Sequence, residues 1–195
     1  LMAIFPGSAI PSAAADAYTI DNSLRFNDSD DSRLTKTIST SGDRKTFTIS
    51  FWFKRGNLGL NNTRFFSSRT SGSDEFYSGS YSFWLLTTQV FRDPSAWYHY
   101  CLQFDSTQGT ASNRAKLYIN GEQVTAFATE TYPSQDLETP VNKATSDVVI
   151  GDHEGALGSY VWDGYIAEWF HIDGQSNPAS TFGELNSTTN QWIPL

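Results

Sequence analysis

Asp152, His153 and Glu154 form the densest group of potential ligands in the sequence. They follow Val148-Val149-Ile150-Gly151, a pattern typical of a short buried strand, so we expect them on a loop at the rim of a sheet. Carboxylate oxygens are the ligands that Ca²⁺ prefers, and the ion binds about six to eight of them. Two interpretations stay open: a calcium site to which Asp152 and Glu154 contribute, or an acidic turn in solvent.

Two aromatic residues, Tyr160 and Trp162, lie next to Gly158 and Ser159, in a segment typical of a loop. Exposed aromatic rings stack on sugars and anchor protein interfaces. Tyr160, Trp162 and His153 are therefore the candidate binding residues. The alternative is that the two rings lie at the rim and fold back over the core.

Glu168 is the single carboxylate in the segment 164–172. Hydrolysis of a glycosidic bond commonly needs two carboxyl groups about 5 to 9.5 Å apart. The next carboxylate, Asp173, is five residues further on and falls at the end of the predicted strand. We therefore predict no catalytic residue and no enzymatic activity. Glu168 is interpreted as a structural or surface hydrogen-bonding group, with a catalytic role as the alternative.

Histidine and cysteine, the other reactive residue types, are interpreted as structural. His99 and His171 fall within predicted strands, where backbone hydrogen bonding is the simpler role. Cys101 is the sole cysteine, which excludes an intrachain disulfide and paired cysteine ligands for zinc. We expect it to be a small buried hydrophobe. The sequence contains neither a Gly-x-Ser-x-Gly nor a His-Glu-x-x-His motif.

The composition of the 195 residues is rich in aromatic side chains and poor in charge, with 15% Phe, Trp and Tyr against 17% Asp, Glu, Lys and Arg. A chain of this length and composition can bury the core of one domain. The net charge of −8 disfavours nucleic acid as a partner, because phosphates bind a basic face. No apolar window approaches the roughly 18 residues of a membrane span, so membrane insertion is not expected.

Alternation of polar and apolar residues predicts strands. In 46–54 Phe and Ile alternate with Thr and Ser, which predicts one face in the core and a wetter opposite face. The segment 97–105 is apolar on both faces and should be central. Asn120-Gly121 supplies the two positive-φ residues of a tight hairpin turn within 115–124. Further strands are expected at 23–27, 64–67, 81–87, 147–151 and 164–172, and one helical turn at 177–182.

Many short strands without a long helix predict an all-β fold, a two-sheet antiparallel β-sandwich. Residues 21–185 are assigned to this sandwich. Residues 1–20 are assigned to an extended N-terminal arm, because prolines and a glycine interrupt the apolar run that a signal sequence requires. Residues 186–195 are assigned to a C-terminal tail or a linker to a further region.

Four segments occur in an order that resembles the laminin-G-like, concanavalin A-like jelly-roll family. They are Phe47-Thr48-Ile49-Ser50-Phe51-Trp52-Phe53-Lys54, Trp97-Tyr98-His99-Tyr100, Lys116-Leu117-Tyr118-Ile119-Asn120-Gly121 and Asp163-Gly164-Tyr165-Ile166-Ala167-Glu168. The resemblance covers residues 23–184, most of the chain. It implies two curved antiparallel sheets and, in many members, calcium at one edge.

The segments 23–27, 54–59, 88–99 and 171–175, followed by Phe182-Gly183-Glu184, are similar to laminin-G-like modules in virion structural proteins of tailed bacteriophages, marine ones especially. This resemblance implies a non-enzymatic module on the virion surface, in a fibre, tail or capsid, with other virion proteins as partners. It implies no cofactor, with calcium as an alternative. We also expect a homo-oligomer, a trimer being one form, in which the arm docks on a neighbouring subunit.

Two other functions stay open. The first is a carbohydrate-binding adhesin whose rim loops bind host-surface glycans, with or without calcium. The second is a jelly-roll glycanase that acts through Glu168.

Overall fold

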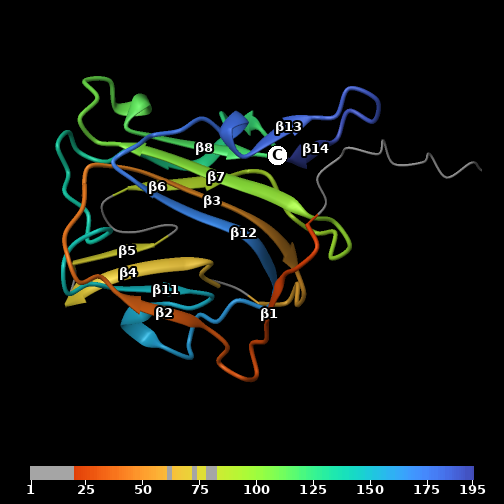
Figure 1. The fold of residues 1–195 in the computed structure, drawn as a ribbon, viewed down its shortest axis with the longest axis horizontal. Coiled ribbons are helices and arrows are strands. Elements are labelled where there is room, and N and C mark those ends of the chain that lie inside the picture. The colour runs from red at the N-terminus through yellow and green to blue at the C-terminus, as the bar shows by residue number, and fades with distance from the viewer. Residues whose placement is uncertain (1–19, 61–62, 72–73, 78–82) are drawn as a thin grey trace, which may run out of the picture.

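The computed structural model describes residues 20–60, 63–71, 74–77 and 83–195, which form mainly strands (Figure 1). The strands are β1 (Leu24–Phe26), β2 (Leu34–Thr37), β3 (Thr46–Arg55), β4 (Phe66–Ser71), β5 (Asp74–Tyr77), β6 (Trp84–Thr87), β7 (Tyr98–Asp105), β8 (Ala115–Ile119), β9 (Glu122–Gln123), β10 (Phe127–Thr131), β11 (Asp147–Ile150), β12 (Gly164–Asp173), β13 (Gly183–Leu185) and β14 (Trp192–Pro194). Short 3₁₀ turns occur at η1 (Ala111–Asn113), η2 (Glu154–Ala156) and η3 (Ala179–Thr181), the last within the predicted turn at 177–182. No helix among these residues is long and apolar enough to cross a membrane. The predicted arm lies outside the described residues, apart from its last residue.

Six strands pair in the order β1-β12-β3-β7-β8-β9 to form the larger sheet. β3 and β7 lie at its centre and are antiparallel, with Phe47 opposite Phe104 and Phe53 opposite Tyr98. The two strongest alternating segments of the sequence therefore pair directly with each other. Both predicted strands are confirmed, as is the central position of β7.

A second sheet, in the order β2-β11-β4-β5, packs against the first (Figure 1). Phenylalanines fill the space between the layers: Phe47 stacks on Phe104 at 4.6 Å, and Phe66 of β4 lies 5.6 Å from Trp169 of β12. Each fully buried phenylalanine stabilises the fold by about 1.5–3 kcal/mol through removal of apolar surface from water. The predicted two-sheet sandwich is confirmed. β2, whose residues are all exposed, was not expected because its sequence shows no apolar alternation.

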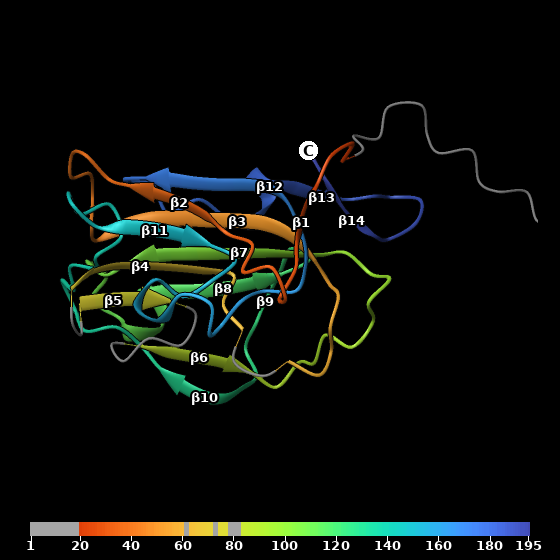
Figure 2. The same ribbon diagram turned by 90° about the horizontal axis from the view of Figure 1, so that it is seen from below.

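β6 and β10 form a separate two-stranded ribbon along one side of the sandwich (Figure 2). Their pairing joins Trp84 to Thr131 and Thr87 to Phe127, with a register shift between Phe127 and Thr129. In Figure 2 the ribbon lies below β5 and β8. It borders the cavity described below.

The hairpin between β8 and β9 turns at Asn120 and Gly121, as predicted. Both residues have positive φ, 50° for Asn120 and 79° for Gly121. Turns of this hand match the right-handed twist of the paired strands. The β8–β9 register, with Ile119 opposite Glu122, confirms the two-residue connection.

The outward face of β3 is buried, although the sequence pattern predicted a wetter surface. Thr48 and Ser50 have no exposed area. Thr48 Oγ1 donates to the carbonyl of Gln175 at 2.7 Å and accepts the N–H of Asn177 at 2.7 Å. The chain that follows β12 therefore supplies hydrogen bonds to polar side chains that would otherwise face solvent.

Residues 186–195, assigned from the sequence to a tail or linker, contribute β14, which pairs with β13. Figure 1 shows this hairpin on the outer side of the six-stranded sheet. The Trp192 ring lies 5.9 Å from the His99 ring and packs near Cys101 and Phe182. A second, smaller apolar cluster thus forms on this side of the sheet.

Candidate functional site

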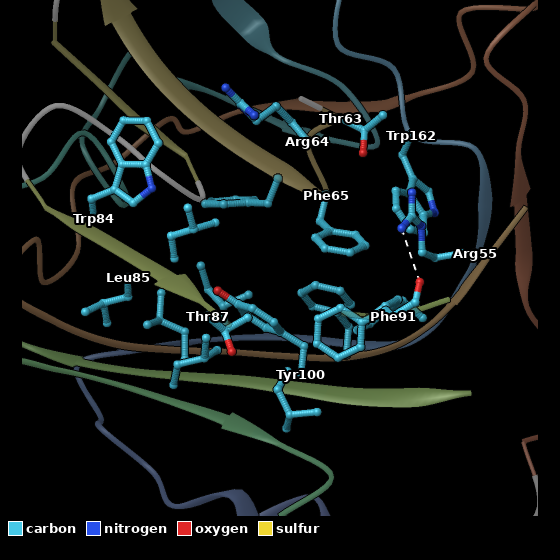
Figure 3. A pocket seen from close by; sticks show the side chains of 18 of the residues that line it. Arg55, Thr63, Arg64, Phe65, Trp84, Leu85, Thr87, Phe91, Tyr100 and Trp162 are labelled. Carbon is cyan, nitrogen blue, oxygen red and sulfur yellow. Dashed lines mark hydrogen bonds between the residues drawn. The ribbon is translucent and has the colours of Figure 1, made fainter. Parts of the chain in front are cut away.

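A cavity of about 420 Å³ lies between the inner face of the six-stranded sheet and the strands β4 and β6 (Figure 3). Small-molecule sites in proteins commonly enclose about 300–1,000 Å³. β3, β7 and β8 supply one wall because their apolar side chains alternate toward the core. The opposite wall comes from β4, β6 and the residues that precede them.

Aromatic rings form most of the wall near the centre of the cavity. Phe51 stacks on Tyr100 at 4.8 Å and lies 5.2 Å from Phe65. Burial raises the pKa of the Tyr100 hydroxyl well above its ordinary value, with a smaller contribution from nearby Cys101. The hydroxyl is therefore neutral at any physiological pH.

One end of the cavity carries nitrogen donors. Arg55 is paired with Gly164, so its side chain and that of Trp162 both lie where β3 ends and β12 begins. Arg55 Nη1 donates to the carbonyl of Phe91 at 3.2 Å (Figure 3). Trp162 is only 3% exposed, and its Nε1–H has no hydrogen-bond partner among the described residues. No acidic side chain occurs among the described residues that line the cavity, so this end offers donors without a counter-charge.

The opposite end of the cavity carries Trp84 (Figure 3). Trp84 is the first residue of β6 and is 45% exposed, so its side chain belongs both to the cavity wall and to the protein surface. A ring in this position can contact a ligand that enters from solvent.

Asp152 and Glu154 lie on the predicted loop, but their carboxylates are already engaged by the protein. Asp152 is fully buried and accepts the backbone N–H groups of His153 and Gly158, both at 2.7 Å. Arg33 Nη1 lies 3.7 Å from Asp152, and Arg69 Nη1 lies 3.5 Å from Glu154. Among the described residues no group of three or more potential ligands is placed to hold a metal ion. Asp152 thus braces the loop, and the geometry does not fit the calcium site considered from the sequence.

His153 and Tyr160, two of the predicted binding residues, are brought together by the fold. Their rings meet edge to face at 5.3 Å, and the Arg64 guanidinium lies 5.1 Å above the Tyr160 ring. His153 is 9% exposed. These side chains pack on one another and do not form the free recognition tip that was one expectation.

Trp162, the third predicted binding residue, is not at an exposed tip either. Its ring lies 4.3 Å from Phe65 and 6.0 Å from Phe53, within the main core. Of the two interpretations made from the sequence, the ring of a rim residue that folds back over the core agrees better with this position than an exposed recognition tip. Its place in the cavity wall gives it a different candidate role from the one predicted.

Glu168 lies at a bulge in β12, where the register with β3 shifts between Ala167 and Phe170. Its φ is 48°, a left-handed conformation that bulges accommodate. Glu168 is not among the residues that line the cavity, so no acid faces a ligand there. The described residues of the cavity wall include no pair of carboxylates of the kind used in glycoside hydrolysis.

Ser50 and His99 form a pair whose distance would suit a nucleophile and its base: 2.8 Å from Ser50 Oγ to His99 Nε2. Both side chains are fully buried, on the outer face of the sheet under the C-terminal hairpin. His99 Nδ1 accepts the indole N–H of Trp192 at 3.1 Å, whereas a catalytic histidine is oriented by a carboxylate that accepts from it. Burial lowers the pKa of His99 from 6.5 to about 4. The pair is structural.

Sequence reasoning missed Arg55, Tyr100 and Trp84 as potential ligand contacts. The sequence did contain a signal for Arg55. This residue continues the two-residue spacing of Phe51 and Phe53 and therefore occupies a core-facing position of β3. A charge at such a position indicates a partner or a ligand. Trp84 gave no comparable signal, since its role depends on pairing with β10.

Comparison with known proteins places this geometry in a family context. The family model described as the concanavalin A-like lectin/glucanases superfamily matches residues 26–173. No curated protein sequence matches the chain.

Three solved structures are similar at the level of the fold. Domain 4 of AbnA, a GH43 extracellular arabinanase from Geobacillus stearothermophilus in complex with arabinotriose, has 15% identity and a TM-score of 0.49, covering 75% of this chain and 68% of that chain. The heptameric SAP-like pentraxin from Limulus polyphemus has 18% identity and a TM-score of 0.49, covering 71% and 68%. The Trypanosoma rangeli sialidase in complex with sialic acid has 12% identity and a TM-score of 0.43, covering 85% and 27%.

Proposed function

The chain belongs to the concanavalin A-like lectin/glucanases superfamily, and on this basis we propose that it is a non-catalytic binding module whose ligand occupies the aromatic cavity. The observation that carries the proposal is the cavity itself, which has the volume of a ligand site. Its apolar walls and few convergent polar groups are typical of small-molecule sites. A ligand that fills this space removes apolar surface of the wall from water, which favours binding.

The absence of acid and base groups at the cavity supports a non-catalytic role. No carboxylate lines it within the described part of the chain. Tyr100 holds its proton too firmly to act as a base near neutral pH, because burial disfavours the phenolate. The groups that remain can bind and orient a ligand but supply no proton transfer.

Binding of a neutral naphthylamine dye, whose fluorescence increases in apolar surroundings, tests the cavity directly. We expect one dye molecule per chain and competition by apolar ligands. Leu117→Phe, which adds volume at the cavity wall, should weaken dye binding, whereas Leu185→Phe on the exposed β13 should not. Equal dye binding by the two variants would place the dye elsewhere and contradict the proposal.

A carbohydrate-binding adhesin is the second candidate, favoured by the exposure of Trp84 at the border of the cavity. A sugar ring that stacks on this indole would be held at the surface, next to the cavity. A glycan array should then detect binding that Trp84→Ala abolishes and that EDTA leaves unchanged, because Asp152 and Glu154 are engaged by arginines. Release of reducing ends that Glu168→Gln prevents would instead support a glycanase.

The wider setting proposed for this module is the surface of a tailed-phage virion, as part of an oligomeric fibre, tail or capsid protein. The support is the set of sequence segments at 54–59, 88–99 and 171–175. Peptides of this chain in purified particles, and antibody labelling of intact particles, test the assignment. Labelling confined to free protein in the lysate would contradict it.

A further inference from the structure

The cavity is asymmetric in polarity, and this asymmetry restricts its ligand. Along most of its length the wall consists of aromatic and aliphatic side chains from β3, β7, β8 and β6. Arg64 and Trp84 also line the cavity, but the Arg64 guanidinium lies over the Tyr160 ring and the Trp84 indole lies at the opposite end. Arg55 and Trp162 are the two nitrogen donors that meet at one end (Figure 3). A ligand that fills this space must have an apolar body and a polar group at one end.

The polar group must accept hydrogen bonds. Trp162 Nε1 is buried and can only donate, and it has no partner among the described residues. An unpaired buried donor is costly, which makes it a site where a ligand atom is favoured. Arg55 also has donors only and carries a fixed positive charge, and its side chain donates to the carbonyl of Phe91.

The charge at this end favours an anion over a neutral acceptor. Five other basic side chains of the protein have an acidic partner within 4 Å, namely Arg25, Arg33, Arg44, Lys45 and Arg69. Arg55 has no acidic partner within 4 Å in the described part of the chain, and no carboxylate lies among the described residues of the cavity wall. A neutral sugar would find no acidic side chain here to accept its hydroxyl protons. A carboxylate would receive charge-assisted hydrogen bonds, which are about twice as strong as neutral ones.

We propose that the cavity binds a molecule with an aliphatic or aromatic body and one carboxylate, which is held by Arg55 and the Trp162 indole N–H. The body lies along Phe51, Phe65 and Tyr100 toward Trp84. This inference rests on the proposed function, because it names the ligand class of the same cavity.

Displacement of the neutral dye by decanoate and by decanol, measured on the same protein at neutral pH, tests the ligand class. The two probes share a body and differ in the head group. We expect decanoate to displace the dye at lower concentration than decanol. The measured quantity is the ratio of the two affinities, because this ratio cancels any change in cavity shape that a variant causes.

Two arginine variants provide the matched comparison. Arg55→Gln removes the charge at the cavity, and the decanoate preference should fall on the order of tenfold to a hundredfold, as for loss of one hydrogen bond to a charged group. Arg92→Gln removes an exposed arginine of the same region and should leave the ratio unchanged. Trp162→Phe keeps the ring and removes the N–H, and should lower the ratio in the same direction.

The outcomes separate the two proposals. If the dye does not bind, or neither probe displaces it, the cavity is not a ligand site and the proposed function fails. If both probes compete but the ratio is the same in wild type, Arg55→Gln and Arg92→Gln, the cavity binds ligands and the carboxylate assignment is wrong.

Discussion

Acidification should destabilise this protein well above the pH at which carboxylates titrate, because His99 is buried in its neutral form. Its pKa falls from 6.5 to about 4 as burial disfavours the charged ring. The unfolded chain therefore takes up a proton at His99 between these two values while the folded chain does not. Stability contributed by the neutral ring is fully present above pH 6.5 and is lost as the pH falls toward 4.

The size of this effect follows from the difference in proton uptake. For a group whose pKa is 6.5 in the unfolded chain and about 4 in the folded chain, the free energy of unfolding falls by about 2 kcal/mol as the pH is lowered from 7 to 5. This is a substantial part of the 5–15 kcal/mol typical of a domain. Burial also lowers the pKa of His171, which adds to the loss in the same direction. The pKa of Asp163 is lowered, so the stability that its carboxylate contributes is lost only at more acidic pH. The change in stability between pH 7 and pH 5 therefore reports on the histidines.

Urea unfolding at a series of pH values, followed by tryptophan fluorescence, measures the effect. His99→Gln does not titrate and can still bond to Ser50, so its loss of stability between pH 7 and pH 5 should be smaller than that of wild type by about 2 kcal/mol. His171→Gln serves as the matched variant on the opposite face of the sheet. Identical pH dependence in wild type and His99→Gln would refute the assignment of a neutral, buried His99.

Three further changes have defined expected outcomes. Asp163 accepts from Arg25 at 3.0 Å through Oδ2 and from the backbone N–H of Asn57 at 2.8 Å through Oδ1. Asp163→Asn removes the charge and one of these two acceptor oxygens, and should cost about 2 kcal/mol in urea unfolding at pH 7, a difference that disappears once acid protonates the wild-type carboxyl. Gly121→Ala places Cβ 2.3 Å from the Trp192 ring at a positive φ and should lower Tm, whereas Gly109→Ala, with open space, should not. Leu117→Phe fills empty volume and should leave Tm unchanged or raise it; a clear loss would mean that the cavity is already occupied by protein.

The elements that could be predicted from the sequence are those whose pattern is local. The strand at 46–55 and the Asn120-Gly121 turn follow from alternation and from backbone sterics, which need no knowledge of the rest of the chain. β13 and β14 gave no such pattern, because the hairpin is held by the packing of Trp192 against His99 and Cys101, which lie on a strand far away in sequence. Polar residues on β3 looked solvent-exposed for the same reason.

The candidate site was less predictable than the fold because it is assembled from strands that are distant in sequence. Tyr160 and Trp162 were singled out as loop aromatics, yet the fold buries Trp162 in the wall of the cavity. Asp152 resembled a metal ligand because composition does not reveal that Arg33 and two backbone N–H groups already compensate its charge. The local sequence shows which side chains can bind a ligand, but only the packing shows whether they already form hydrogen bonds or ion pairs within the protein.

The C-terminal hairpin should control the protonation of His99. Trp192 donates its indole N–H to His99 Nδ1 at 3.1 Å, and its ring passes close to Gly121 and Gly183, where any Cβ would collide with it. Trp192→Ala would admit water to the histidine, and we expect the pKa of His99 to rise from about 4 toward its ordinary value, with a loss of about 2 kcal/mol in stability at neutral pH. Histidine ring signals in NMR titrations would report this shift directly.

Trp192→Phe separates the two contributions of the indole. It keeps most of the covering ring but removes the donor, so His99 stays buried and its Nδ1 loses a hydrogen bond. We therefore expect Trp192→Phe to lose stability with a smaller rise in the pKa of His99 than Trp192→Ala, because the donor to the neutral ring is lost while the ring stays buried. If both variants left the titration of His99 unchanged, burial by the hairpin would not be the cause of its low pKa, and residues 186–195 would act independently of the sheet beneath them.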